Sequence, residues 1–177
     1  MTAKTASRRA AKPARRTTKR PSRVRERPVA SIIYVDASAL VKLFLPEPES
    51  AAVNRMLAGQ RQVIVSDLAV TETTSALARR RREGLLRASA AATVHRKMLE
   101  TVEAGFVRLV SLDPPVHRQA ERLLLAIDDI ALRAADALHV ALALSAGATV
   151  MATYDRRLAA AAFRVGLTNA PDQPQLR

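Results

Sequence analysis

The sequence contains no cysteine, which excludes a disulfide framework and any metal site built on thiolates. Aromatic residues are also scarce, because there is no tryptophan and only two tyrosines and three phenylalanines on which nucleic-acid bases can stack. No uninterrupted apolar run reaches about eighteen residues, the length that a transmembrane helix requires. We expect a cytoplasmic protein that does not span a membrane.

Acidic residues are almost missing from the first thirty positions, where eleven Lys and Arg stand against Glu26 alone. This segment therefore carries +10 of the chain's net charge of +13, and it has little apolar material to bury. We expect residues 1–30 to form a disordered basic tail, a kind of segment that binds nucleic acid through its phosphates. Two other interpretations stay open: an organelle transit peptide, although the segment lacks an apolar helical stripe, and a translation start near Val29.

The rest of the chain alternates short apolar runs with helical patterns and is long enough for one domain with a hydrophobic core. We expect strands at residues 32–35, 63–65, 106–112 and 149–153. We expect helices at residues 37–45, 48–57, 67–82, 85–103, 132–146 and 156–165, and another that opens at Pro114. Strands separated by helices imply crossover connections, so the sequence predicts an α/β domain over residues 31–170, with a parallel sheet, and a short tail at 171–177.

Two aspartates stand where predicted strands end. Asp36 follows the first strand and Asp155 follows the last one. Parallel sheets of this kind concentrate binding and catalytic groups at the carboxyl ends of their strands. Both residues are therefore candidates for a site at that edge.

Two further acids stand in unusual surroundings. The helix at residues 132–146 is apolar nearly all round, and its polar residues Arg133, Asp136 and His139 fall three apart on one narrow stripe. A charged stripe on such a helix must face solvent, a partner or a site. Glu72 lies about one turn into the helix after the second strand, which places it near the same sheet edge.

A cluster of these four acids can persist if some carboxylates are protonated or if a cation joins them. Two carboxylates about 5 Å apart repel by about 3 kcal/mol at an effective dielectric constant near 20. Ligands that are all oxygen select a hard divalent ion, Mg²⁺ or Mn²⁺. Such a site suits the attack of water on a phosphodiester.

Each acid also has a purely structural interpretation. Asp36 and Asp155 suit helix N-caps. Asp136 suits an ion pair with Arg133 on a solvated face, and Glu72 suits an ordinary helix surface. The sequence leaves both interpretations open for each residue taken alone.

The four acids occur in the order and context of a known family. The segments IYVDASALVKLF, SDLAVTE, LRAADALHVALA and TYDRRL contain Asp36, Glu72, Asp136 and Asp155 respectively. Over residues 32–167 the sequence resembles the PIN-domain ribonucleases, specifically the VapC toxins of bacterial type II toxin–antitoxin pairs. The resemblance implies a three-layer α/β/α domain with a central parallel sheet.

The resemblance also implies a function and roles for the acids. It implies a Mg²⁺-dependent endoribonuclease, with Mn²⁺ as a substitute, that forms a homodimer and is neutralised by a small cognate antitoxin. Asp36 and Asp136 would be the chief metal ligands, Asp155 would complete the ligand set, and Glu72 would hold a water on the metal or a second ion. Ser38 and Thr153 would support these groups by hydrogen bonding. The basic tail departs from the family, whose members usually begin almost directly at the first strand.

Other residues and functions remain as alternatives. His139 suits either a metal ligand or local packing, and Arg79, Arg80, Arg81 and Arg82 suit either RNA phosphates or a solvated helix end. A phosphorylated receiver domain is disfavoured, because the sequence has no acid pair before the first strand and no lysine at a later strand end. The main alternative to the nuclease is a non-catalytic nucleic-acid-binding module that uses residues 1–30.

Overall fold

The computed structural model describes residues 31–171, so the expected basic tail and residues 172–177 lie outside the described residues. A five-stranded sheet occupies the centre, with the strand order β3-β2-β1-β4-β5 and every neighbouring pair parallel. The strands are β1 (Ile33–Val35), β2 (Val63–Ser66), β3 (Arg108–Val110), β4 (Val150–Ala152) and β5 (Thr168–Ala170). The predicted parallel sheet is confirmed.

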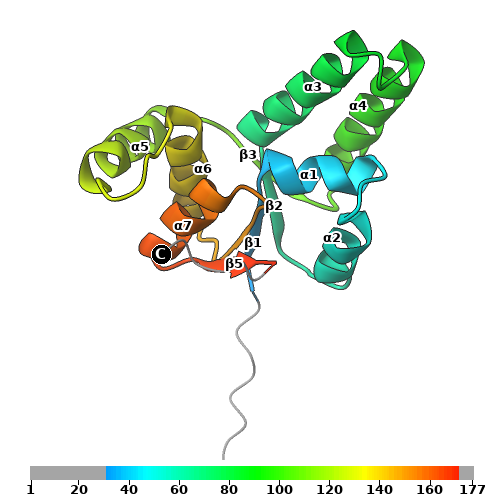
Figure 1. Cartoon of the computed structure of the whole chain (residues 1–177). Coiled ribbons are helices and arrows are strands. Elements are labelled where there is room, and N and C mark those ends of the chain that lie inside the picture. The colour runs from blue at the N-terminus through cyan, green and yellow to red at the C-terminus, as the bar shows by residue number, and fades with distance from the viewer. Residues whose placement is uncertain (1–30, 172–177) are drawn as a thin grey trace, which may run out of the picture.

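Seven helices cover the sheet within the described residues, as Figure 1 shows. They are α1 (Ala37–Phe44), α2 (Ser50–Leu57), α3 (Asp67–Arg82), α4 (Ala88–Glu103), α5 (Pro114–Ala126), α6 (Ala134–Ser145) and α7 (Arg156–Arg164). Helices α5, α6 and α7 gather on one side of the sheet, and α1 to α4 lie on the other. The expected three-layer α/β/α architecture is therefore confirmed.

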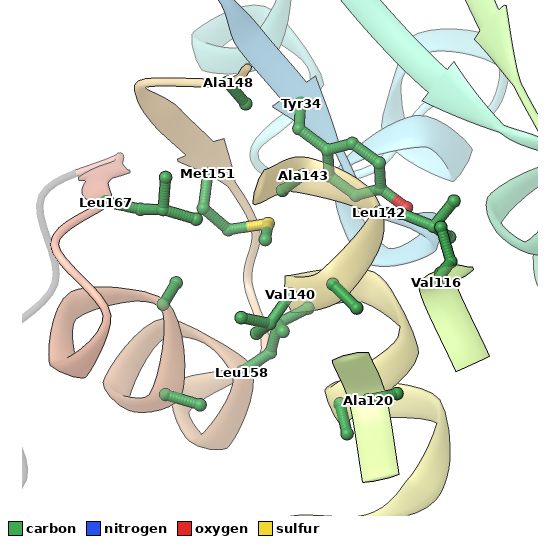
Figure 2. Packing of buried hydrophobic residues seen from close by; sticks show 14 of the residues in the cluster. Tyr34, Val116, Ala120, Val140, Leu142, Ala143, Ala148, Met151, Leu158 and Leu167 are labelled. Atoms are coloured by element: carbon green, nitrogen blue, oxygen red, sulfur yellow. The ribbon is translucent and has the colours of Figure 1, made fainter. Parts of the chain in front are cut away.

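The alternation of side chains along the strands builds two cores. Tyr34, Ile64 and Met151 are neighbours in the strand register, and all three face α5, α6 and α7. Figure 2 shows Tyr34 and Met151 on the same side as Val140 of α6. The residues on either side of them in the strands pack against α1, α3 and α4. Both faces of the sheet are thus buried, as a parallel sheet with apolar strands requires.

The fifth strand was not predicted. The segment Thr168–Ala170 has no apolar run, and its first residue is exposed. It becomes a strand through backbone pairing with β4, in which Thr168 N–H donates to the Thr149 carbonyl and Thr153 N–H donates to the Ala170 carbonyl, both at 3.0 Å. A pattern of side chains does not report such pairing. The other predicted elements exist, although β3 is shorter than the predicted 106–112.

None of the helices within residues 31–171 combines the length and the apolar composition that crossing a membrane would need.

Candidate active site

Helices α1, α3 and α7 begin at the carboxyl edge of the sheet, and a side chain from that edge caps each one. Asp36 caps α1 by accepting a 2.9 Å hydrogen bond from Ala39 N–H, and Ser66 caps α3 through Ala69 N–H. Asp155 caps α7 with its Oδ1, which accepts from Arg157 N–H at 2.8 Å and from the next amide at 3.1 Å. The structural interpretation of Asp36 and Asp155 as N-caps is confirmed, but a cap does not use all the oxygens of a carboxylate.

Asp36 is a buried carboxylate whose oxygens are fixed by hydroxyl groups. Its residue surface is only 3% exposed. Thr153 Oγ1 donates to Asp36 Oδ2 at 2.7 Å, and Ser38 Oγ lies 2.8 Å and 2.9 Å from the two oxygens. The expectation that Ser38 and Thr153 support a ligand therefore agrees with the geometry.

Burial raises the pKa of Asp36, because desolvation disfavours its charged form, although the hydrogen bond from the Ala39 amide opposes this effect. Within the described part of the chain, no Lys or Arg lies within 4.0 Å of this carboxylate. A buried acid without a cationic partner is costly, and a bound cation would offset that cost.

Hydrogen bonds join the loop after β4 to the start of α1. Asp155 N–H donates to Thr153 Oγ1 at 3.0 Å, and Tyr154 N–H donates to Ser38 Oγ at 2.8 Å. Thr153 therefore contacts both Asp36 and the backbone of Asp155. This arrangement brings two of the four predicted acids to one point of the sheet edge.

Asp136 lies in the first turn of α6 and is also buried, with 8% of its surface exposed. Its Oδ2 accepts a 3.1 Å hydrogen bond from the backbone N–H of Arg133 and lies 3.8 Å from Arg157 Nη1. The alternative of an ion pair with the Arg133 side chain on a solvated face is therefore wrong. Of the predicted stripe, Asp136 contacts Arg157 of α7, and His139 contacts β1 and α3, whereas Arg133 is exposed.

Glu72 is held by His139. In α3, Glu72 Oε2 lies 2.7 Å from His139 Nε2, and the other ring nitrogen, Nδ1, lies 2.8 Å from the hydroxyl of Tyr34. Both nitrogens of His139 are occupied, which leaves neither free for a metal in this arrangement. The interpretation of His139 as a residue with local hydrogen bonds is confirmed.

All four acids lie at the same edge of the sheet, linked by short chains of contacts. Asp36 connects to Asp155 through Thr153, and Arg157, whose amide Asp155 caps, connects to Asp136. Glu72 connects to α6 through His139, one turn after Asp136. Over residues 31–171, however, no three His, Cys, Asp or Glu side chains come close enough together to hold a metal ion.

The donor chemistry nevertheless fits a hard divalent cation. The available ligands are carboxylate oxygens, which suit Mg²⁺ or Mn²⁺ and suit soft metals poorly. Asp36 has no cationic partner among the described residues, and the only one of Asp136 is a guanidinium at 3.8 Å. Two buried carboxylates with this little compensation are what a cation would stabilise.

The sequence did not indicate Tyr34, Ser66 or Arg157 as residues of the site. Tyr34 was counted only as part of a strand, although a buried tyrosine hydroxyl usually requires a partner. The four arginines that end α3 differ in their surroundings. Arg80 is bonded to Glu47, whereas Arg79, Arg81 and Arg82 are exposed.

Comparison with known proteins identifies relatives over most of the chain. Residues 33–164 match the PIN domain family. The chain is 37% identical over 144 residues to Ribonuclease VapC45 from Mycobacterium tuberculosis, and the match covers 80% of this chain and 96% of that protein.

Solved structures show the same fold. The crystal structure of PAE2754 from Pyrobaculum aerophilum is 26% identical, with a TM-score of 0.57 over 79% of this chain and 84% of that one. VapC20 from Mycobacterium tuberculosis, described as a toxin that cleaves the sarcin–ricin loop, is 24% identical, with a TM-score of 0.59 over 73% of this chain and 94% of that one.

Proposed function

The chain belongs to the PIN-domain family, with VapC proteins as its relatives, and from this membership we propose that it is a metal-dependent endoribonuclease. It hydrolyses phosphodiester bonds of RNA and acts as the toxin of a toxin–antitoxin pair. The name Ribonuclease VapC45, carried by a relative that is 37% identical, supports the substrate class. The buried acids at the sheet edge support the chemistry.

In this proposal Asp36 and Asp136 hold the ion, Asp155 completes the ligand set, and Glu72 orients the attacking water or holds a second ion. When bound, Mg²⁺ or Mn²⁺ supplies Lewis acidity, which lowers the pKa of water and offsets negative charge on the phosphate. A movement of side chains is required, because the acids of the described residues do not form a ready ligand set as they stand.

The residues around the acids position them for this task. Ser38 and Thr153 fix both oxygens of Asp36, so this ligand changes little in orientation when an ion binds. Arg157, which is 3.8 Å from Asp136 and has a side chain 30% exposed, offers a positive charge to the RNA backbone at the mouth of the site.

The observation that carries the proposal is the state of Asp36: buried, oriented by two hydroxyls, and without a cation among the described residues. The test is cleavage of defined RNAs by the wild type and by Asp36→Asn, with Mg²⁺, with Mn²⁺ and with excess chelator. The amide keeps the cap on α1, and thermal unfolding checks that the variant folds. We expect cleavage to need a divalent ion and to fall at least about 100-fold in the variant, as for loss of a principal catalytic interaction. Undiminished cleavage by Asp36→Asn, or in chelator, would rule the proposal out.

The proposal includes partners and a location. A small antitoxin, encoded beside this protein, binds and inhibits it, and the active protein is a homodimer in the cytoplasm. Co-expression with the adjacent small reading frame, followed by co-purification and light scattering, tests these points. A chain that is monomeric and purifies alone in this experiment would contradict them.

A further inference from the structure

A continuous chain of hydrogen bonds runs beneath the site from the end of β2, through β1 and α6, to α3. Ser66 Oγ lies 2.7 Å from the Tyr34 hydroxyl, which lies 2.8 Å from His139 Nδ1. His139 Nε2 then lies 2.7 Å from Glu72 Oε2. Ser66, Tyr34 and His139 are each at most 3% exposed, so water does not compete for these bonds.

The donors and acceptors in this chain are consistent in only one direction. Ser66 Oγ already accepts the Ala69 amide at 3.0 Å, so the hydroxyl is free to donate to Tyr34. Tyr34 then donates to Nδ1 of His139, and the proton of the imidazole lies on Nε2, from which it is donated to Glu72. If the chain ran in the reverse direction, Nδ1 would carry the ring proton. The unprotonated Nε2 would then face the carboxylate of Glu72 with no hydrogen between them. A doubly protonated ring would leave the Ser66 proton without a partner among the described residues.

Glu72 is therefore held by one oxygen. Within residues 31–171 only its Oε2 has a hydrogen-bond partner, and the side chain is 36% exposed. One oxygen is fixed to the buried imidazole, and the other remains available to the site. A glutamate on a helix surface has three rotatable side-chain bonds, and this contact removes most of that freedom.

We propose that Ser66, Tyr34 and His139 form a positioning relay that keeps the Nε2–H tautomer of His139 and so fixes Glu72 at the active site. The relay rests on the proposed function, because Glu72 matters to catalysis only if the sheet edge cleaves RNA. His139 is a positioning residue that acts through Glu72, not a metal ligand. Tyr34 selects the tautomer, and its burial between the sheet and α6 excludes water from its hydrogen bond to His139.

Two substitutions of His139 separate positioning from packing. In His139→Gln the amide nitrogen reaches the place of Nε2 and keeps a donor to Glu72. In His139→Asn the amide nitrogen reaches only the place of Nδ1, so the donor to Glu72 is lost. Both variants replace the ring with a smaller amide, and both disturb the core. His117→Gln, on an exposed residue of α5, is the matched control.

The experiment combines three readouts on the full chain: the ¹⁵N shifts of the His139 ring, the kcat and KM of RNA cleavage, and thermal unfolding. We expect the wild-type ring to carry its proton on Nε2 without RNA or metal present. We expect His139→Asn to lower kcat about 10- to 100-fold with little change in KM, as for loss of a group that orients a metal-site residue. We expect the kcat of His139→Gln to stay within about threefold of wild type.

Contrary results are easily recognised. A wild-type His139 ring with its proton on Nδ1 would overturn the relay. Equal losses of kcat in His139→Gln and His139→Asn, in proportion to their losses of stability, would overturn it too. The proposed function fails separately, if wild type and Asp36→Asn cleave RNA alike. The tautomer is measured without RNA, so this measurement tests the relay whether or not the protein cleaves RNA.

Discussion

Thr153 Oγ1 donates a 2.7 Å hydrogen bond to Asp36 Oδ2, and it thereby joins two residues 117 positions apart in the sequence. The same oxygen accepts the amide of Asp155 at 3.0 Å. One threonine therefore fixes the orientation of one acid and the backbone of another. This contact shows how the pairing of β1 with β4 brings together two residues of the candidate active site.

Removing that hydroxyl should separate the two acids. We predict that Thr153→Val lowers the free energy of unfolding by about 1–3 kcal/mol, because a buried carboxylate oxygen and an amide lose their partner. RNA cleavage should fall about 10- to 100-fold. Urea denaturation and cleavage rates test both numbers. The control is Thr168→Val, on an exposed residue of β5, which should change neither. If Thr153→Val cleaved RNA at the wild-type rate, the Thr153 hydroxyl would not orient Asp36 for catalysis.

The position of much of this site could be predicted from the sequence. Asp36 and Asp155 follow apolar runs that had to be strands, so their place at the sheet edge follows from the parallel topology. Asp136 was indicated by the conflict between its charge and an apolar helix. In each case a local pattern and one rule of fold geometry sufficed.

Other features depend on contacts that no local pattern contains. The strand β5 forms because its backbone pairs with β4, not because its residues favour a strand. The partners of His139 come from β1 and α3, 105 and 67 positions away. Arg157 approaches Asp136 only because α7 packs on α6. The absence of a ready ligand set could not be predicted either, because spacing in sequence places acids on an edge but does not fix their distances.

A second cluster of charges holds the helices of the site together. Lys42 Nζ of α1 lies 2.8 Å from Glu47 and 2.6 Å from Glu49, and Glu47 is also bonded to Arg80 of α3. Burial raises the pKa of Glu47, but the hydrogen bonds from Lys42 and Arg80 outweigh it and leave the pKa below its ordinary value of 4.5. The cluster joins the helix that follows Asp36 to the helix that carries Glu72.

The stabilisation from Glu47 should be lost in acid. Because its pKa is lowered in the folded state, its contribution is complete above pH 4.5 and disappears as the pH falls through the folded-state pKa. We predict that Glu47→Gln lowers the free energy of unfolding at neutral pH by about 1–3 kcal/mol. Below pH 4.5 the variant should lose stability less steeply than wild type. Denaturant titrations across this pH range measure both effects.

The control for this prediction is Glu100→Gln, in an exposed ion pair with Arg96 at 3.5 Å, which should change stability little at any pH. Parallel pH profiles of Glu47→Gln and wild type would contradict the role of Glu47.

The basic segment at residues 1–30 supports a separate prediction. Deleting residues 1–28 removes ten net positive charges. If the active site cleaves RNA by itself, the truncated chain keeps its kcat, while its affinity for RNA falls and depends less steeply on salt. Cleavage and RNA binding over a series of salt concentrations separate these effects. Loss of cleavage in a truncated chain that still folds would favour the alternative function, in which residues 1–30 are essential for the action on nucleic acid.

We predict that Asp36 and Asp136 share a divalent cation at the carboxyl edge of the sheet. The most direct measurement is anomalous X-ray diffraction from crystals of the protein that contain Mn²⁺. We expect one strong peak within about 2.0–2.6 Å of carboxylate oxygens of both residues, the range for hard cations in proteins. A structure with Mn²⁺ bound elsewhere, or with Asp36 and Asp136 too far apart to contact one ion, would contradict it.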